Sequence, residues 1–219
     1  MAMGNPVAPY LAPLPLIAVL RGITRDEVPA IGEVLVGAGF RMLEVPLNSP
    51  RPFDSIAELA RRWGDSCLVG AGTVLEEADA ARVRDAGGRL VVMPHADAAV
   101  IRAAKAQGLV CLPGVATPTE AFDALRAGAD GLKMFPAEAL PPGVLKAWRA
   151  VLPKSTLLFP VGGIGPDSLA AYWAAGASGF GTGSGLYRPG SDTTAVAAAA
   201  HALAAACLAL PPRSEGASS

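Results

Sequence analysis

The sequence LVGAGTVLEEADAARVRDAGGRLVVM, residues 68–93, holds two short apolar runs with an amphipathic segment between them. The runs cover residues 68–74 and 90–93, and residues 76–86 carry the 3.6-residue spacing of a helix. Gly87 and Gly88 stand where that helix has to end. Short strands that are apolar throughout, separated by helices, are typical of parallel sheets covered on both faces, so this stretch predicts a βαβ unit.

The same unit recurs along most of the chain. The predicted strands cover residues 16–21, 42–47, 68–74, 90–93, 110–113, 131–135, 157–161 and 179–183. The predicted helices that follow them cover residues 26–38, 52–63, 76–86, 97–106, 118–127, 143–151, 166–175 and 193–210. Eight such units in about 200 residues predict an α/β fold, a compact (β/α)8 TIM barrel in a single domain.

We place that domain at residues 15–210, after an N-terminal extension over residues 1–14 and before a polar tail over residues 211–219. An open, doubly wound sheet is the alternative. It is disfavoured because the units are evenly spaced and no G-x-G-x-x-G follows the first predicted strand.

Composition and charge exclude several classes of protein. The chain has 219 residues, 52% of them hydrophobic and 17% charged, with a formal net charge of −1. This balance lacks the basic stripe that nucleic-acid binding requires. The Ala-rich residues 193–210 contain His201 and predict a packed helix instead of a membrane span. The N-terminus has four prolines and no basic region, so we expect no signal peptide and a cytoplasmic protein.

Two charged residues interrupt predicted strands. Lys133 lies within residues 131–135 and Glu44 within residues 42–47, and the two-residue alternation of a strand turns both inward if their apolar neighbours face the helices. A buried lysine pairs with a carboxylate or has a lowered pKa, and a lysine so tuned attacks carbonyls to form a Schiff base. A carboxylate beside the imine can transfer protons. A Lys–Glu pair that only fills the core is the alternative.

Further candidates follow other predicted strands. Arg21 ends the first strand and offers a planar fork of donors for a carboxylate or phosphate, and Thr73 offers a hydroxyl at the end of the third. Residues 161–165 and 181–185 are glycine-rich and follow the seventh and eighth strands. In barrels these two loops commonly bind phosphate through backbone N–H groups. The residues therefore predict a barrel enzyme that forms a lysine imine with a phosphorylated keto compound.

Neither a metal nor a cofactor is expected. The histidines are His95 and His201, and no paired carboxylates accompany either of them. Cys67, Cys111 and Cys207 are far apart, which predicts buried free thiols in place of a disulfide framework or a zinc site. His95 ends the fourth predicted strand and could contact substrate there.

Five motifs, in this order and spacing, closely resemble the 2-keto-3-deoxy-6-phosphogluconate and 2-keto-3-deoxy-6-phosphogalactonate aldolases. They are LIAVLRG at residues 16–22, EVPLNSP at 44–50, GAGTV at 70–74, LKMFP at 132–136 and VGG at 161–163. The resemblance implies a class I aldolase, usually a homotrimer of barrels without a cofactor. It also implies that the enzyme releases pyruvate and glyceraldehyde 3-phosphate from a phosphorylated 2-keto-3-deoxy sugar acid.

The resemblance also implies roles for individual residues. Lys133 would form the Schiff base, Glu44 would carry protons, and Arg21 and Thr73 would bind the pyruvate end. The groups around the phosphate would be Gly162, Gly163, Gly183 and Ser184. Asn48 matches the galactonate branch, since the gluconate enzymes have an arginine there, so we expect the galactonate compound as substrate.

Other functions remain open. One is an aldolase that is specific for the gluconate epimer or accepts both epimers. Another is a phosphosugar-binding barrel without catalysis, in which Lys133 is only a structural or phosphate-contacting cation. A third is an isomerase or synthase that uses Glu44 as a simple base.

Overall fold

The computed structural model describes residues 4–212, in which parallel strands alternate with helices. The strands are β1 (Leu16–Val19), β2 (Met42–Pro46), β3 (Leu68–Gly72), β4 (Leu90–Val92), β5 (Val110–Leu112), β6 (Gly114–Val115), β7 (Leu132–Met134), β8 (Leu158–Pro160) and β9 (Phe180–Thr182). The α-helices are α1 (Val28–Gly37), α2 (Pro52–Trp63), α3 (Glu77–Asp85), α4 (Ala98–Ala106), α5 (Pro118–Arg126), α6 (Pro142–Arg149), α7 (Pro166–Ala174) and α8 (Thr193–Leu208). Two 3-10 turns, η1 (Ala8–Tyr10) and η2 (Ala137–Ala139), complete the set.

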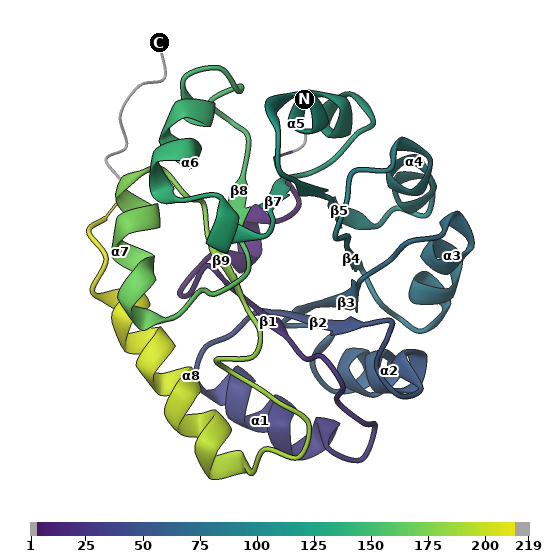
Figure 1. The fold of residues 1–219 in the computed structure, drawn as a ribbon. Coiled ribbons are helices and arrows are strands. Elements are labelled where there is room, and N and C mark those ends of the chain that lie inside the picture. Colours follow the sequence, from purple (N-terminus) through teal and green to yellow (C-terminus); the bar gives the residue numbers. More distant parts are fainter. Residues whose placement is uncertain (1–3, 213–219) are drawn as a thin grey trace.

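All strand pairs in the two sheets are parallel. The larger sheet has the order β5-β4-β3-β2-β1-β9, and the smaller has the order β6-β7-β8. Val161, directly after β8, forms a parallel bridge to Gly181 in β9. The strands curl around the centre of the molecule and the helices surround them (Figure 1). The prediction of a parallel α/β fold is therefore confirmed.

Helix boundaries follow local signals in the sequence. Before α5, the side chain of Thr117 accepts a hydrogen bond from the N–H of Glu120 at 3.3 Å, and the Glu120 carboxylate accepts one from the N–H of Thr117 at 2.9 Å. This capping box satisfies N–H groups that the first helical turn leaves unpaired. Gly128, with φ of 105°, lies just beyond the end of the same helix. Such signals explain why the predicted and observed helices agree closely.

The fifth predicted strand differs from the observed one. Residues 110–113 were expected to form a single strand, whereas the structure has β5 and β6 with Pro113 between them. Proline has no N–H to donate to a ladder, so regular pairing is interrupted there. Its carbonyl still accepts a hydrogen bond from the N–H of Lys133 at 2.9 Å. The interruption lets β5 pair with β4 while β6 pairs with β7.

The apolar core has two parts. The larger cluster lies between the strands and the helices and includes Leu43, Val45, Leu132 and Met134. The smaller cluster includes residues of the opposite strand face, such as Met42. Helix α8 contributes five buried residues to the larger cluster, in line with the packed helix predicted at residues 193–210. None of the helices in residues 4–212 is long and apolar enough to cross a lipid bilayer.

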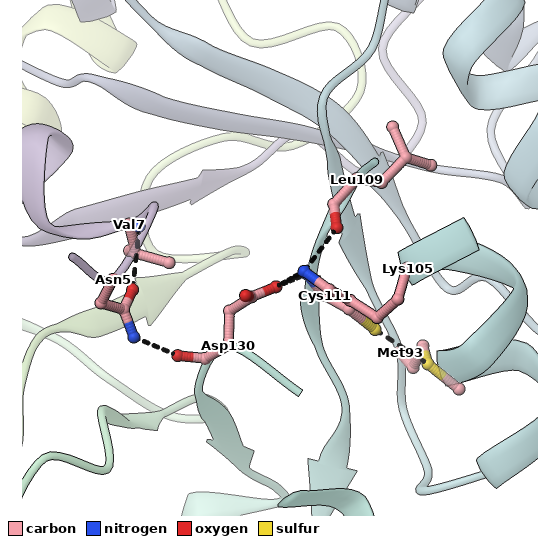
Figure 2. A network of polar contacts seen from close by, with 7 residues as sticks. All are labelled: Asn5, Val7, Met93, Lys105, Leu109, Cys111 and Asp130. Carbon is pink, nitrogen blue, oxygen red and sulfur yellow. Dashed lines mark hydrogen bonds and ion pairs between the residues drawn. The ribbon is translucent and has the colours of Figure 1, made fainter. Parts of the chain in front are cut away.

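Residues near the N-terminus pack into the smaller cluster, where Val7 is fully buried. Figure 2 shows how this segment is held: the Asn5 side-chain amide donates to the carbonyl of Asp130 at 2.6 Å. The Asp130 carboxylate in turn accepts from Lys105 Nζ at 2.6 Å and from the N–H of Cys111 at 2.8 Å. Because Asp130 precedes β7, this network lies at the amino ends of the strands. A functional site is expected at the opposite end, where the strands have their carboxyl ends.

Candidate active site

Lys133 on β7 and Glu44 on β2 lie on the inner face of the strands. Leu132 and Met134, on either side of Lys133, belong to the core cluster between strands and helices, so Lys133 points the other way. The same holds for Glu44. Lys133 is 6% exposed and Glu44 is 2% exposed. The fold thus places an amine and a carboxyl group, both nearly removed from water, on the inner face of the curved sheets.

The surroundings of Lys133 favour its neutral form. Burial lowers the pKa of Lys133, the Glu44 carboxylate opposes this by raising it, and the Arg21 guanidinium lowers it further. The Nζ atom lies 4.4 Å from the centroid of the Phe135 ring. An amine with a lowered pKa keeps more of its lone pair available near neutral pH, which makes it a better nucleophile toward a carbonyl carbon.

The pKa of Glu44 is shifted in the opposite direction, and this shift also favours the neutral form of the group. Burial raises the pKa of Glu44 to about 7, although the positive charges of Lys133 and Arg21 partly offset that rise. Its Oε2 atom is buried and has no hydrogen-bond partner among the described residues. A buried polar atom left unpaired calls for an explanation. A carboxyl group with a pKa near 7 can both donate and accept a proton at neutral pH, and proton transfer supplies that explanation.

Gly72 makes room for the Glu44 carboxyl group. It lies in β3, the neighbour of β2, and a Cβ atom at this position would overlap the carboxylate of Glu44. This role of Gly72 is not among those predicted from the sequence. The available signal was glycine inside an apolar strand at residues 70–72, which often marks a close approach of another group.

Arg21, Asn48 and Thr73 meet in the loops that follow β1, β2 and β3. Arg21 donates from Nη1 to Asn48 Oδ1 at 2.6 Å and from Nη2 to Thr73 Oγ1 at 3.4 Å. Thr73 has a φ of 54°, a left-handed conformation that is uncommon for a β-branched residue. Arg21 is exposed and lies two residues beyond the end of β1. The three side chains form a polar rim around the carboxyl ends of these strands.

The two glycine-rich loops lie next to each other. Gly162 and Gly163 follow β8 with φ of 111° and 63°, and the bridge from Val161 to Gly181 joins this loop to β9. Gly183 and Ser184 come directly after β9. Left-handed backbone of the kind seen at 162–163 favours glycine and turns successive N–H groups in a way that can bind anions.

Glu138 is a neighbour of this loop that the sequence analysis missed. It lies in η2, after β7, and a Cβ atom on Gly162 or Gly163 would overlap its side chain. Glu138 is exposed, and its carboxylate lies beside Gly162. No local sequence pattern distinguishes this glutamate, because its position depends on β7 and β8 being neighbours.

The remaining candidates are His95 and the three cysteines. His95 is exposed in the loop after β4. Cys67, Cys111 and Cys207 are buried free thiols, as predicted. Within residues 4–212, no three His, Cys, Asp or Glu side chains gather in a group that could hold a metal ion.

Comparison with known proteins finds a matching family model and several similar chains. A family model described as "Aldolase: KDPG and KHG aldolase" matches residues 7–198. The chain is 49% identical over 176 residues to a probable 2-dehydro-3-deoxy-6-phosphogalactonate aldolase of Rhizobium meliloti, covering 80% of this chain and 83% of the relative. It is 47% identical over 189 residues to the 2-dehydro-3-deoxy-6-phosphogalactonate aldolase of Escherichia coli, covering 85% and 92%.

Solved structures agree with these relatives. A native KDPGal structure has a TM-score of 0.88 at 45% identity and covers 90% of this chain and 96% of its own. A cube-shaped protein cage, designed by fusing symmetric oligomeric domains, has a TM-score of 0.87 at 45% identity, with coverage of 89% and 72%. The KDPG aldolase of Legionella pneumophila, with pyruvate captured as a covalent carbinolamine, has a TM-score of 0.76 at 26% identity, covering 94% and 97%.

The family resemblance that the five motifs predicted is thus confirmed. A family model spans most of the chain, and two relatives are close to half identical over at least four fifths of it. The chain belongs to the KDPG and KHG aldolase family and is an aldolase, a carbon–carbon lyase.

Proposed function

We propose that this aldolase cleaves 2-dehydro-3-deoxy-6-phosphogalactonate to pyruvate and glyceraldehyde 3-phosphate through a Schiff base on Lys133. The observation that carries the proposal is a buried lysine with a lowered pKa that shares the interior with a carboxyl group of pKa about 7. The relatives from R. meliloti and E. coli that bear this substrate in their names support the choice of compound.

The chemistry needs one nucleophile and one group that moves protons. The neutral Lys133 amine attacks the C2 carbonyl carbon to give a carbinolamine. The hydroxyl group of the carbinolamine takes up a proton and leaves as water, which gives a protonated imine. Breaking the C3–C4 bond sends its electron pair into the imine, which becomes an enamine, while the C4 hydroxyl loses its proton and becomes the aldehyde. Protonation of the enamine at C3 and hydrolysis of the imine release pyruvate. Glu44, with its pKa near 7, is suited to carry these protons.

Two sets of groups hold the ends of the substrate. Arg21 and Thr73 bind the carboxylate at C1, because the guanidinium is a permanent fork of donors beside a hydroxyl. The glycine-rich loops bind the phosphate at C6, to which the N–H groups of residues 162, 163 and 183 and the hydroxyl of Ser184 donate hydrogen bonds. Holding both ends places C2 near Lys133 and turns a bimolecular encounter into an oriented one.

We further propose that the two sheets form a single (β/α)8 barrel over residues 15–210. Pro113 alone separates β5 from β6, and the bridge from Val161 links the smaller sheet to β9. Residues 1–14 are then an extension whose described part fills one end of the barrel, and residues 211–219 are a tail that lies mostly outside the described residues. The homotrimer implied by the sequence remains a proposal, supported by the designed cage of oligomeric domains, and so does the cytoplasmic location.

Trapping with borohydride tests the proposed chemistry. Incubation with pyruvate and sodium borohydride is expected to reduce the imine and leave a pyruvyl group on the peptide that contains Lys133, as detected by peptide mass spectrometry. Borohydride without pyruvate is the control and leaves that peptide unmodified. A phosphosugar-binding barrel without catalysis forms no adduct, and its absence at Lys133 would overturn the imine mechanism.

The two C4 epimers test the choice of substrate. Asn48 accepts a short hydrogen bond from Arg21 at the rim of the site. The loop after β2 therefore presents a neutral amide at the position where the gluconate enzymes have an arginine, which would add a second positive charge. We expect kcat/KM to be higher for the phosphogalactonate compound than for the phosphogluconate compound, measured by coupling pyruvate release to its reduction. A higher value for the gluconate epimer would contradict the assignment, and equal values would indicate dual specificity.

A further inference from the structure

Glu27 connects two loops of the proposed site. It lies directly before α1, and each of its carboxylate oxygens serves a different segment of the chain. Oε2 accepts hydrogen bonds from the N–H and the hydroxyl of Thr24 at 2.8 and 2.7 Å. Oε1 accepts from the hydroxyl of Tyr187 at 3.1 Å and from the N–H of Gly190 at 3.4 Å. A single side chain thus joins the start of α1 to Tyr187 and Gly190, which lie 160 and 163 positions further along the chain.

The carboxylate is ionised at neutral pH. Burial raises the pKa of Glu27, but hydrogen bonds from Thr24, Tyr187 and Gly190 outweigh burial and leave that pKa below its ordinary value. Burial, together with the charge and the hydrogen bond of Glu27, raises the pKa of Tyr187, so the hydroxyl stays protonated as the donor. Hydrogen bonds to an ionised acceptor are stronger than those between neutral groups.

The segments that Glu27 joins carry groups from opposite ends of the substrate site. Thr24 lies three residues after Arg21, and Tyr187 lies three residues after Ser184. Arg188, beside Tyr187, donates from Nε to the carbonyl of Ser184 at 3.0 Å. The loops also touch directly, because a Cβ atom on Gly22 would collide with the ring of Pro189.

We propose that Glu27 is a positioning residue that fixes residues 183–190 against the loop of Arg21 and so sets the distance between the two anion-binding ends of the site. The proposal rests on the proposed function, in which the substrate carries a carboxylate at C1 and a phosphate at C6. The length of the substrate is fixed, so both ends bind well only when the two loops keep a matching separation. Pyruvate spans only the Arg21 end and does not depend on that separation.

A purely local role for Glu27 does not account for all its contacts. Thr24 and Glu27 have the T-x-x-E spacing of a capping box, and the bond from the Thr24 N–H to Oε2 is the one that the glutamate of such a motif accepts just before α1. It does not explain why Oε1 is turned toward Tyr187 and Gly190. The two roles can be separated experimentally, because Tyr187→Phe removes a bond to Oε1 and leaves those to Oε2 in place.

The test compares the phosphorylated substrate with pyruvate in three variants. Tyr187→Phe is expected to raise KM for 2-dehydro-3-deoxy-6-phosphogalactonate about tenfold, the size expected for one hydrogen bond to a charged group. The value of kcat and the yield of the borohydride-trapped pyruvate adduct stay unchanged. Glu27→Gln raises KM at least as much, because an amide cannot accept at both oxygen positions. Glu33→Gln, the same change at an exposed position of α1, leaves KM as in the unmodified enzyme.

Each outcome decides the matter. Unchanged KM in both Tyr187→Phe and Glu27→Gln overturns the positioning role. A lower melting temperature with unaltered KM also overturns it, because that result shows a role in stability alone. Tyr187→Phe removes only a hydroxyl group, so it remains informative if Glu27→Gln does not fold. Absence of a pyruvate adduct in the unmodified enzyme is a separate result, since it refutes the imine chemistry and this inference with it.

Discussion

Lys133→Met is expected to abolish cleavage, with kcat reduced by at least about 10⁴-fold, the order seen when a catalytic nucleophile is removed. Methionine has nearly the length of lysine and suits the buried position, but its thioether cannot form an imine. Without the imine there is no acceptor for the electron pair of the C3–C4 bond. The proposed anion-binding loops are unchanged, so we expect substrate binding to persist while turnover is lost.

Initial rates of pyruvate release measure this effect, and the melting temperature of the variant shows that it is folded. Lys146→Met is the matched control, because Lys146 is exposed on α6 and the substitution is the same. Full activity is expected there. An isomerase or synthase that uses Glu44 as a simple base makes the opposite prediction, because substantial turnover would survive in Lys133→Met. Such survival would exclude the Schiff base.

The fold was predictable because its signals are local. Proline before a helix, glycine after it and continuously apolar strands all lie within a few residues of the boundary they define. The predicted helix at residues 52–63 coincides with α2. The inward direction of Lys133 and Glu44 was also a local inference, because alternation along a strand requires only the identities of neighbouring residues. A charged residue is conspicuous in a chain with 17% charged residues.

Other features depend on which segments become neighbours in space, and no local pattern contains that information. Gly72 matters because β3 lies beside β2, and Glu138 because η2 lies over the loop after β8. Val7 belongs to a segment that the sequence predicts to be an extension before the domain, yet it is fully buried in the smaller apolar cluster. The bonds of Glu27 to Tyr187 and Gly190 join opposite ends of the chain. Such contacts require the assembled fold.

Glu44→Gln is expected to lower kcat by about 10² to 10⁴, the usual range for general acid–base catalysis. Glutamine keeps the shape of the side chain beside Gly72 but can neither accept the C4 hydroxyl proton nor deliver one to the enamine. Lys133 remains, so the borohydride-trapped pyruvate adduct still forms. The pH profile of kcat/KM also loses the limb near pH 7 that a group with that pKa produces in the free enzyme. An unchanged kcat would remove Glu44 from the mechanism.

The same substitution has a second effect, on stability, with a sign set by the pKa shift. The pKa of Glu44 rises from 4.5 to about 7 on folding, so its contribution to stability is complete below pH 4.5 and is lost as the pH rises through 7. A shift of this size corresponds to roughly 3 kcal/mol. We therefore compare the free energy of unfolding of Glu44→Gln with that of the unmodified enzyme by denaturant unfolding at pH 5 and at pH 8. The difference is expected to move in favour of Glu44→Gln between pH 5 and pH 8, whereas the exposed control Glu33→Gln shows no such change. A loss at pH 8 would mean that the ionised carboxylate is stabilised by Lys133 and Arg21 more than burial penalises it.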